Sequence, residues 1–225
     1  MHVVAVNVGL PREVEWNGRK VLTGIFKSPV HARVPVCRVN IDGDGQADLT
    51  VHGGPDKALY AYPSEHYGPW AERLGYELSP GNFGENLTTQ GLLEDAVHIG
   101  DEFRVGTARL VITQPRLPCF KLGIRFGEPG MVKSFLQAKK PGIYFAVLEE
   151  GEVGPGDVIE RLFEDASRIT VTDMLRLVLD RDAAPAALRR LLGVPSLAAV
   201  WRKTLEERLG ILTPTDPPTQ TREFP

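Results

Sequence analysis

Short apolar segments separated by glycine-containing turns fill residues 1–163 and constrain the fold more than any other feature of the chain. Apolar stretches run over residues 3–8, over residues 97–113 on either side of a glycine, and over residues 143–148. Short runs of β-branched residues between turn residues are typical of strands. We expect strands in all three places, with a hairpin within 97–113, and a further strand over residues 153–160 that pairs with 143–148.

Only two helices are expected among these strands. Ser64, a residue type that favours N-caps, precedes apolar residues at helical spacing up to Leu74, and residues 131–140 form a second such segment before Pro141. Many short strands with few helices favour a β-barrel over a repeated strand–helix–strand unit. The fold class is therefore predicted to be mixed α/β and rich in β-structure, with a barrel as its main part.

The pattern changes near residue 164, where apolar residues begin to recur at helical spacing. Thr172 is a candidate cap for a first helix, Pro185 opens a second and Ser196 opens a third. The end of the chain is rich in proline and threonine and poor in apolar groups, so we expect it to be disordered. The predicted domains are a β-barrel over 1–163, three helices over 164–212 and a disordered tail over 213–225.

The charge of the chain is nearly balanced. Its 26 basic and 29 acidic residues give a net charge of −3 and are spread along the sequence, so no basic field exists to hold a nucleic acid. No apolar run is long enough to cross a bilayer, and the first residues lack the features of a signal peptide. We expect a soluble, cytoplasmic protein that acts on a small molecule and has neither nucleic acid nor membrane as a partner.

The chain has two cysteines, and a cytoplasmic setting favours free thiols over a disulfide. Cys37 lies in an apolar run with nothing nearby to activate it, so a structural role is expected.

Cys119 stands in the segment Gln-Pro-Arg-Leu-Pro-Cys-Phe-Lys, residues 114–121. Its prolines favour a rigid extended loop that presents the thiol, and Arg116 and Lys121 favour the thiolate, which attacks electrophiles and binds soft metals. These residues alone leave open whether Cys119 is functional or a small core residue.

Two glycine-rich segments are candidates for pocket loops. The segment His52-Gly53-Gly54-Pro55-Asp56-Lys57 suits an anion, because glycines expose backbone N–H groups and Lys57 adds charge, although it also fits a tight turn. His52 alone is typical of a hydrogen-bonded loop histidine, since a zinc site needs further ligands nearby. Residues 81–87 could line a pocket or turn a corner.

The acidic residues Asp42 and Asp44 are predicted to form turns. An EF-hand calcium loop starting at Asp42 would need glycine at position 47 and glutamate at position 53, where this chain has Ala47 and Gly53.

Four motifs together resemble the MOSC domain, the family named for the C-terminal domain of molybdenum-cofactor sulfurase, and within it the YiiM type. They are Gly43-Asp44-Gly45-Gln46-Ala47-Asp48, His52-Gly53-Gly54-Pro55-Asp56-Lys57-Ala58, Gly84-Glu85-Asn86-Leu87 and residues 114–122, in the family's order. The resemblance implies a β-barrel that binds the molybdopterin cofactor, followed by a small three-helix domain. YiiM-type proteins are associated with reductive detoxification of N-hydroxylated bases such as hydroxylaminopurine.

The resemblance also implies the site. Cys119 would be the catalytic residue and the molybdenum ligand. The residues expected to bind the cofactor are Lys27, His52, Gly53, Gly54, Lys57, Asn86, Arg116 and Cys119.

Reducing N–OH to N–H consumes two electrons and releases water, so an electron donor is required. The sequence has no flavin or haem motif, and two cysteines cannot hold an iron–sulfur cluster through four thiolates. A separate reductase partner is therefore expected.

Two other functions stay open at this point. Cys119 could carry a persulfide, or present the cofactor to another enzyme, without turnover of its own. Alternatively, Cys119 could be an acyl-transfer nucleophile with His52 as its base, which requires that the two side chains meet in space.

Overall fold

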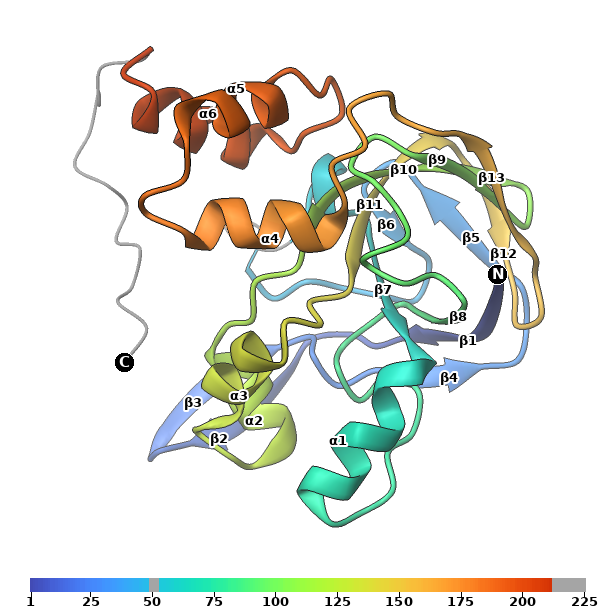
Figure 1. The fold of residues 1–225 in the computed structure, drawn as a ribbon. Coiled ribbons are helices and arrows are strands. Elements are labelled where there is room, and N and C mark those ends of the chain that lie inside the picture. Colours follow the sequence, from blue (N-terminus) through green and yellow to red (C-terminus); the bar gives the residue numbers. More distant parts are fainter. Residues whose placement is uncertain (49–52, 212–225) are drawn as a thin grey trace.

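The computed structural model describes residues 1–48 and 53–211 (Figure 1). The predicted tail, residues 213–225, lies outside the described residues. The main sheet has eight strands in the order β13-β9-β10-β11-β7-β8-β1-β4. In chain order these are β1 (His2–Val8), β4 (Ser28–Val30), β7 (Leu59–Pro63), β8 (Leu87–Gln90), β9 (Glu102–Val105), β10 (Ala108–Pro115), β11 (Ile143–Glu149) and β13 (Ile159–Phe163).

Two small sheets and the helices complete the described part of the chain. A hairpin of β2 (Arg12–Trp16) and β3 (Arg19–Thr23) forms one sheet, and β5 (Val34–Cys37), β6 (Asn40–Ile41) and β12 (Gly151–Val153) form the other. The helices are η1 (Pro55–Lys57), η2 (Ser64–His66), α1 (Tyr67–Leu74), α2 (Phe120–Phe126), α3 (Met131–Ala138), α4 (Val171–Leu179), α5 (Pro185–Leu192) and α6 (Ala199–Arg208).

The main sheet is rich in β-structure as predicted, but it is not a closed barrel. Its edges are β4 and β13, which do not pair with each other in the described residues. Pro29 lies in the short strand β4 and has no N–H to donate, so it suits an edge. Backbone hydrogen bonds from Val3 N to Asp157 O and from Ile159 N to Met1 O, both 2.9 Å, still link the first residues of the chain to the turn before β13 and to its first residue. The sheet is therefore strongly curled but open.

Most of the predicted local elements are present. β1, the β9–β10 hairpin, β11, α1 and α3 lie where the sequence predicts them, and Pro185 opens α5. The predicted pairing of residues 153–160 with 143–148 is wrong, because β12 pairs with β5 and β13 pairs with β9. Helix α2 was not expected, since prolines precede it and it begins directly after Cys119.

Cys37 does not have the core position that its apolar surroundings suggested. Along β5 the side chains alternate, with Val34 and Val36 buried and Cys37 exposed. The apolar run therefore belongs to a strand with one buried face, and Cys37 is on the other.

The three C-terminal helices pack against the main sheet and share its core (Figure 1). Thr170, not Thr172, caps α4, because its Oγ1 accepts a hydrogen bond from Asp173 N at 2.9 Å. Ala198, not Ser196, precedes α6. Buried residues of α4 and α5, such as Met174 and Leu191, belong to the same apolar cluster as the sheet. The predicted boundary at residue 163 stays a prediction, but no separate core lies beneath the described helices.

Helix α6 is also tied to η1 by hydrogen bonds. The Asp56 carboxylate accepts a hydrogen bond from Ala199 N at 2.7 Å, which places a negative charge at the first residue of α6. Thr113 on β10 donates from its Oγ1 to Asp56 O at 2.7 Å, and its backbone carbonyl accepts a hydrogen bond from Ala198 N at 3.4 Å. These bonds join a turn of the main domain to the beginning of the last helix.

None of the helices within residues 1–48 and 53–211 combines the length and the apolar character needed to span a membrane.

We predict that Met174→Ala lowers the free energy of unfolding of the whole chain by about 2–5 kcal/mol, because it leaves a cavity in the core shared by helices and sheet. Leu179→Ala, at the exposed end of the same helix, is the control and should cost less than about 0.5 kcal/mol. Urea unfolding followed by circular dichroism measures both variants. An equally small effect of the two substitutions would contradict the shared core.

Candidate functional site

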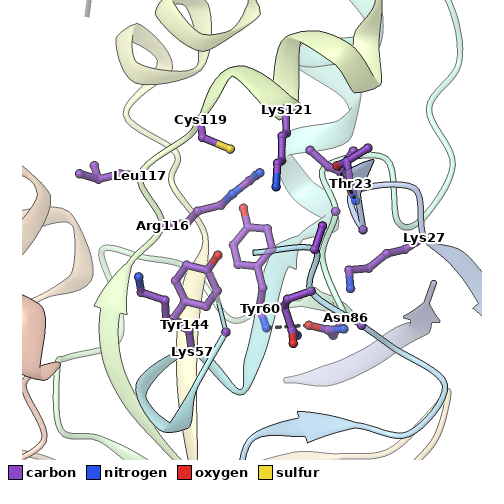
Figure 2. Close-up of a pocket in the computed structure, with 17 residues that line it drawn as sticks. Thr23, Lys27, Lys57, Tyr60, Asn86, Arg116, Leu117, Cys119, Lys121 and Tyr144 are labelled. Atoms are coloured by element: carbon purple, nitrogen blue, oxygen red, sulfur yellow. Dashed lines mark hydrogen bonds between the residues drawn. The ribbon is translucent and has the colours of Figure 1, made fainter. Parts of the chain in front are cut away.

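A pocket opens where the loop after β3, the segment around residue 45, η1, β7 and the start of α2 come together (Figure 2). It has a volume of about 90 Å³, enough for a group the size of a phosphate. Six of the residues predicted from the sequence line it together: Lys27, Gly53, Lys57, Asn86, Arg116 and Cys119. Gly54 lies next to it and accepts a hydrogen bond from Lys57 N at 3.0 Å, and His52 lies outside the described residues.

Cys119 is positioned by the end of a strand and the start of a helix. β10 ends at Pro115, the chain continues as an extended loop, and Cys119, with φ −119° and ψ 172°, directly precedes α2. Its carbonyl accepts a hydrogen bond from Leu122 N at 2.9 Å, which closes the first turn of α2. The half-buried thiol lies close to Arg116 and Lys121 at one side of the pocket (Figure 2). The predicted loop is therefore correct for residues 116–119 but wrong for residues 114–115, which end β10, and for residues 120–121, which begin α2.

Arg116 is a buried cation without a carboxylate partner among the described residues. Its Nη1 donates a hydrogen bond to Phe83 O at 2.8 Å, and its guanidinium lies 4.8 Å from the centre of the Tyr60 ring and 5.6 Å from that of Phe135. Ring faces attract a guanidinium, which makes its burial less costly. Since arginine stays protonated in proteins, this positive charge remains directed at the pocket.

Tyr60 and Tyr144 form the floor below Arg116 and were not expected from the sequence. They are direct partners across β7 and β11, their ring centres lie 5.2 Å apart, and both hydroxyls point toward Arg116 (Figure 2). Burial raises the pKa of both hydroxyls, so they stay neutral at physiological pH. Nothing local in the sequence marks these residues, because strands far apart in the chain bring them together.

Lys27 forms a buried ion pair with Asp44. The exposed fractions of the two side chains are 7% and 0%. Asp44 also accepts hydrogen bonds from Gly9 N at 3.0 Å and from Asn86 Nδ2 at 2.9 Å. Burial lowers the pKa of Lys27, and the Asp44 carboxylate opposes this shift. Asp44 is thus a buried anchor, and the prediction that it merely forms a turn was incomplete.

Asn86 lines the pocket, but its side-chain amide bonds to the protein. Its Oδ1 accepts from Tyr60 N at 3.1 Å, and its Nδ2 donates to Asp44 and, at 3.4 Å, to Asn7 O. Asn86 therefore positions Asp44 and β7 in this structure.

Glu85 shapes the glycine-rich loop before β8. Its buried carboxylate accepts hydrogen bonds from Tyr67 Oη, from Gly81 N at 2.7 Å, from Phe83 N at 3.0 Å and from Thr88 Oγ1 at 2.8 Å. Gly84 has φ +75°, and a Cβ there would lie 2.9 Å from Ile25 Cγ1. The loop can approach the pocket wall because residue 84 is glycine.

The charges around the pocket favour an anion. Lys27, Lys57, Arg116 and Lys121 line it, and Asp44 pairs with Lys27. Burial lowers the pKa of Lys57, and neighbouring Asp56 opposes this shift. In the described part of the chain no three His, Cys, Asp or Glu side chains gather to hold a metal ion. A thiol beside clustered cations fits a cofactor that brings its own metal ligands and a phosphate, with Cys119 as one further ligand.

The acyl-transfer hypothesis needs His52 beside Cys119. Because His52 lies outside the described residues, that hypothesis gains nothing from the structure.

Comparisons with known proteins agree with these features. A family model described as the MOSC domain matches residues 48–160, and one described as the YiiM-like, 3-alpha helix domain matches residues 169–210. The chain is 42% identical over 214 residues to the protein YflK of Bacillus subtilis (strain 168), covering 95% of this chain and 97% of YflK. It is 34% identical over 190 residues to the protein YiiM of Escherichia coli (strain K12), covering 83% and 84%.

A more distant relative and a solved structure add to this. A protein named "Reductase" from Gibberella moniliformis is 29% identical over 171 residues, which are 74% of this chain but 30% of that protein. The crystal structure of YiiM from Geobacillus stearothermophilus superposes with a TM-score of 0.78 at 36% identity, covering 92% of this chain and 98% of that one. Given the two matched family models and these relatives, the chain belongs to the MOSC family and carries the YiiM-like three-helix domain.

Proposed function

We propose that the pocket binds the molybdenum cofactor, with Cys119 as a metal ligand, and that the protein reduces N-hydroxylated compounds such as hydroxylated purine bases. The observation that carries the proposal is the half-buried thiol of Cys119 beside a group of cations that includes the buried Arg116. Membership of the MOSC family and the relative named "Reductase" support it.

The chain's own residues would hold and orient the ligand. Arg116, Lys57 and Lys121 supply charge for a phosphate, while Gly53 and Gly84 let the backbone come close. The Cys119 thiolate is a soft donor of the kind that molybdenum accepts. Bound in this way, the cofactor supplies the two-electron chemistry, and the protein supplies placement and electrostatics.

Electrons would come from a separate reductase. The sequence contains only Cys37 and Cys119, too few thiolates for an iron–sulfur cluster. The half-buried position of the Cys119 thiol also suits a persulfide that must reach an acceptor, so a sulfur carrier without turnover is the second candidate.

Cys119→Ser tests the central role of the thiol, because it nearly keeps the shape and replaces a soft donor by a hard hydroxyl. After expression in a host that makes molybdopterin, we expect molybdenum content and the reduction of N-hydroxylated bases with an artificial electron donor to fall to background. The melting temperature should change little. Cys37→Ser, at the other and exposed thiol, should keep all three properties.

The outcomes separate the candidates. Bound sulfane sulfur that depends on Cys119, in a wild-type protein that reduces nothing, would favour the sulfur carrier. A molybdenum-loaded Cys119→Ser protein that turns over at the wild-type rate would refute both roles of the thiol.

Anion binding should weaken at alkaline pH because of Lys57. Burial lowers its pKa, so the ammonium loses its proton at a lower pH than an exposed lysine does. Lys57→Arg keeps its positive charge at the pH where the lysine loses its proton, so the loss of sulfate affinity should move to higher pH. Lys57→Ala should weaken sulfate affinity about tenfold at neutral pH. Calorimetric titration with sulfate, which stays ionised throughout, measures both effects.

Lys133, exposed on α3, provides the matched control. Lys133→Arg and Lys133→Ala should leave the pH profile unchanged. A profile that Lys57→Arg does not move would show that Lys57 contributes no charge to the anion site.

A further inference from the structure

Two arginines contact the ring of Phe26 near the pocket. The guanidinium carbon of Arg12, the first residue of β2, lies 3.9 Å from the ring centre, and that of Arg125, in the last turn of α2, lies 5.4 Å from it. Phe26 follows β3, and the hairpin and α2, which lie near each other in Figure 1, each contribute one arginine to this ring. Stacking on an aromatic face holds a guanidinium in place and leaves its in-plane N–H groups available to a ligand.

Neither arginine has an acidic partner within the described residues. Arg125 Nη2 donates to Asn82 Oδ1 at 2.7 Å, but its Nε is buried and makes no hydrogen bond. A buried donor without an acceptor is costly and indicates a missing partner. Glu85 attracts Arg125 electrostatically, yet its carboxylate is occupied by the donors of its own loop. The two guanidiniums therefore form a local excess of positive charge.

This pair is adjacent to the pocket but distinct from its lining. Arg12 pairs with Thr23 across the β2–β3 hairpin. Arg125 lies one helical turn beyond Lys121. Thr23 and Lys121 both line the pocket. Along α2, Arg125 comes six residues after Cys119, which corresponds to about 9 Å of helix axis. An anion between the arginines would thus be held roughly a nucleoside's length from the Cys119 end of the helix.

We propose that Arg12, Phe26 and Arg125 form a phosphate subsite for the substrate, so that the preferred substrate is an N-hydroxylated nucleotide rather than the free base. This inference rests on the proposed function of the pocket. Arginine pairs bind phosphate through several charge-assisted hydrogen bonds, and neither guanidinium is paired with a carboxylate among the described residues. The sugar of a nucleotide separates its phosphate from the reacting nitrogen, so the phosphate reaches the arginines while the base reaches the pocket.

Binding of adenosine 5′-monophosphate compared with adenosine tests the subsite without turnover. The wild-type protein with its cofactor should bind the monophosphate at least about tenfold more tightly, and the double variant Arg12→Gln/Arg125→Gln should lose this preference. Arg19→Gln, an exposed arginine on the same hairpin, is the control and should keep it. Kinetic assays compare kcat/KM for the N-hydroxylated nucleotide with kcat/KM for the N-hydroxylated base. The ratio of the two values should fall about tenfold in the double variant and stay unchanged in Arg19→Gln.

Three results would each contradict one claim: the existence of the subsite, its assignment to the substrate, or the proposed function. A wild-type protein that reduces the free base but does not distinguish adenosine 5′-monophosphate from adenosine overturns the subsite and leaves the proposed function intact. Loss of molybdenum from the double variant overturns the assignment to substrate, because the arginines would then hold a phosphate of the cofactor. In the third result, the wild-type protein prefers the monophosphate yet binds no molybdenum and reduces no N-hydroxylated base. That result would support the subsite and contradict the proposed function.

Discussion

The buried carboxylate of Asp44 holds three segments of the chain around the pocket. It accepts hydrogen bonds from the backbone after β1, from Lys27 and from Asn86. Removing one partner of a buried ion pair typically costs about 3–5 kcal/mol, because the other charge is left without compensation. The backbones also touch directly, since a Cβ at Gly24 would lie 2.2 Å from Gly45 O. The ion pair of Asp44 and the close backbone contact that Gly24 allows together fix this wall of the pocket.

The charge of Arg116 is not matched by a carboxylate among the described residues. Arg116 is buried, and it relies on aromatic rings and a carbonyl instead of a carboxylate. Such an arrangement costs stability that an anionic ligand restores when it binds, because a ligand that binds only the folded state stabilises it. The protein is therefore expected to be most stable with its pocket occupied.

Local patterns in the sequence predicted the elements better than their partners. The alternation in β11 and the glycine turn between β9 and β10 are local features, so both were predictable. The pairing of Tyr60 with Tyr144 and the open edges of the sheet depend on contacts between distant segments, which no local pattern encodes. The grouping of six predicted residues in one pocket followed from motif resemblance, whereas Asp44 was taken for a turn residue because its burial is not visible in sequence.

The hydrogen bond between Asp56 and the first residue of α6 has a mechanical consequence. Asp56 is held by the last helix on one side and by Thr113 of β10 on the other, and the next residue, Lys57, lines the pocket. The position of α6 and the position of a cation of the pocket are therefore linked through one short turn. The three C-terminal helices are thus built into the wall that carries Lys57, so a substitution at the start of α6 is expected to reach the pocket although it lies outside the lining.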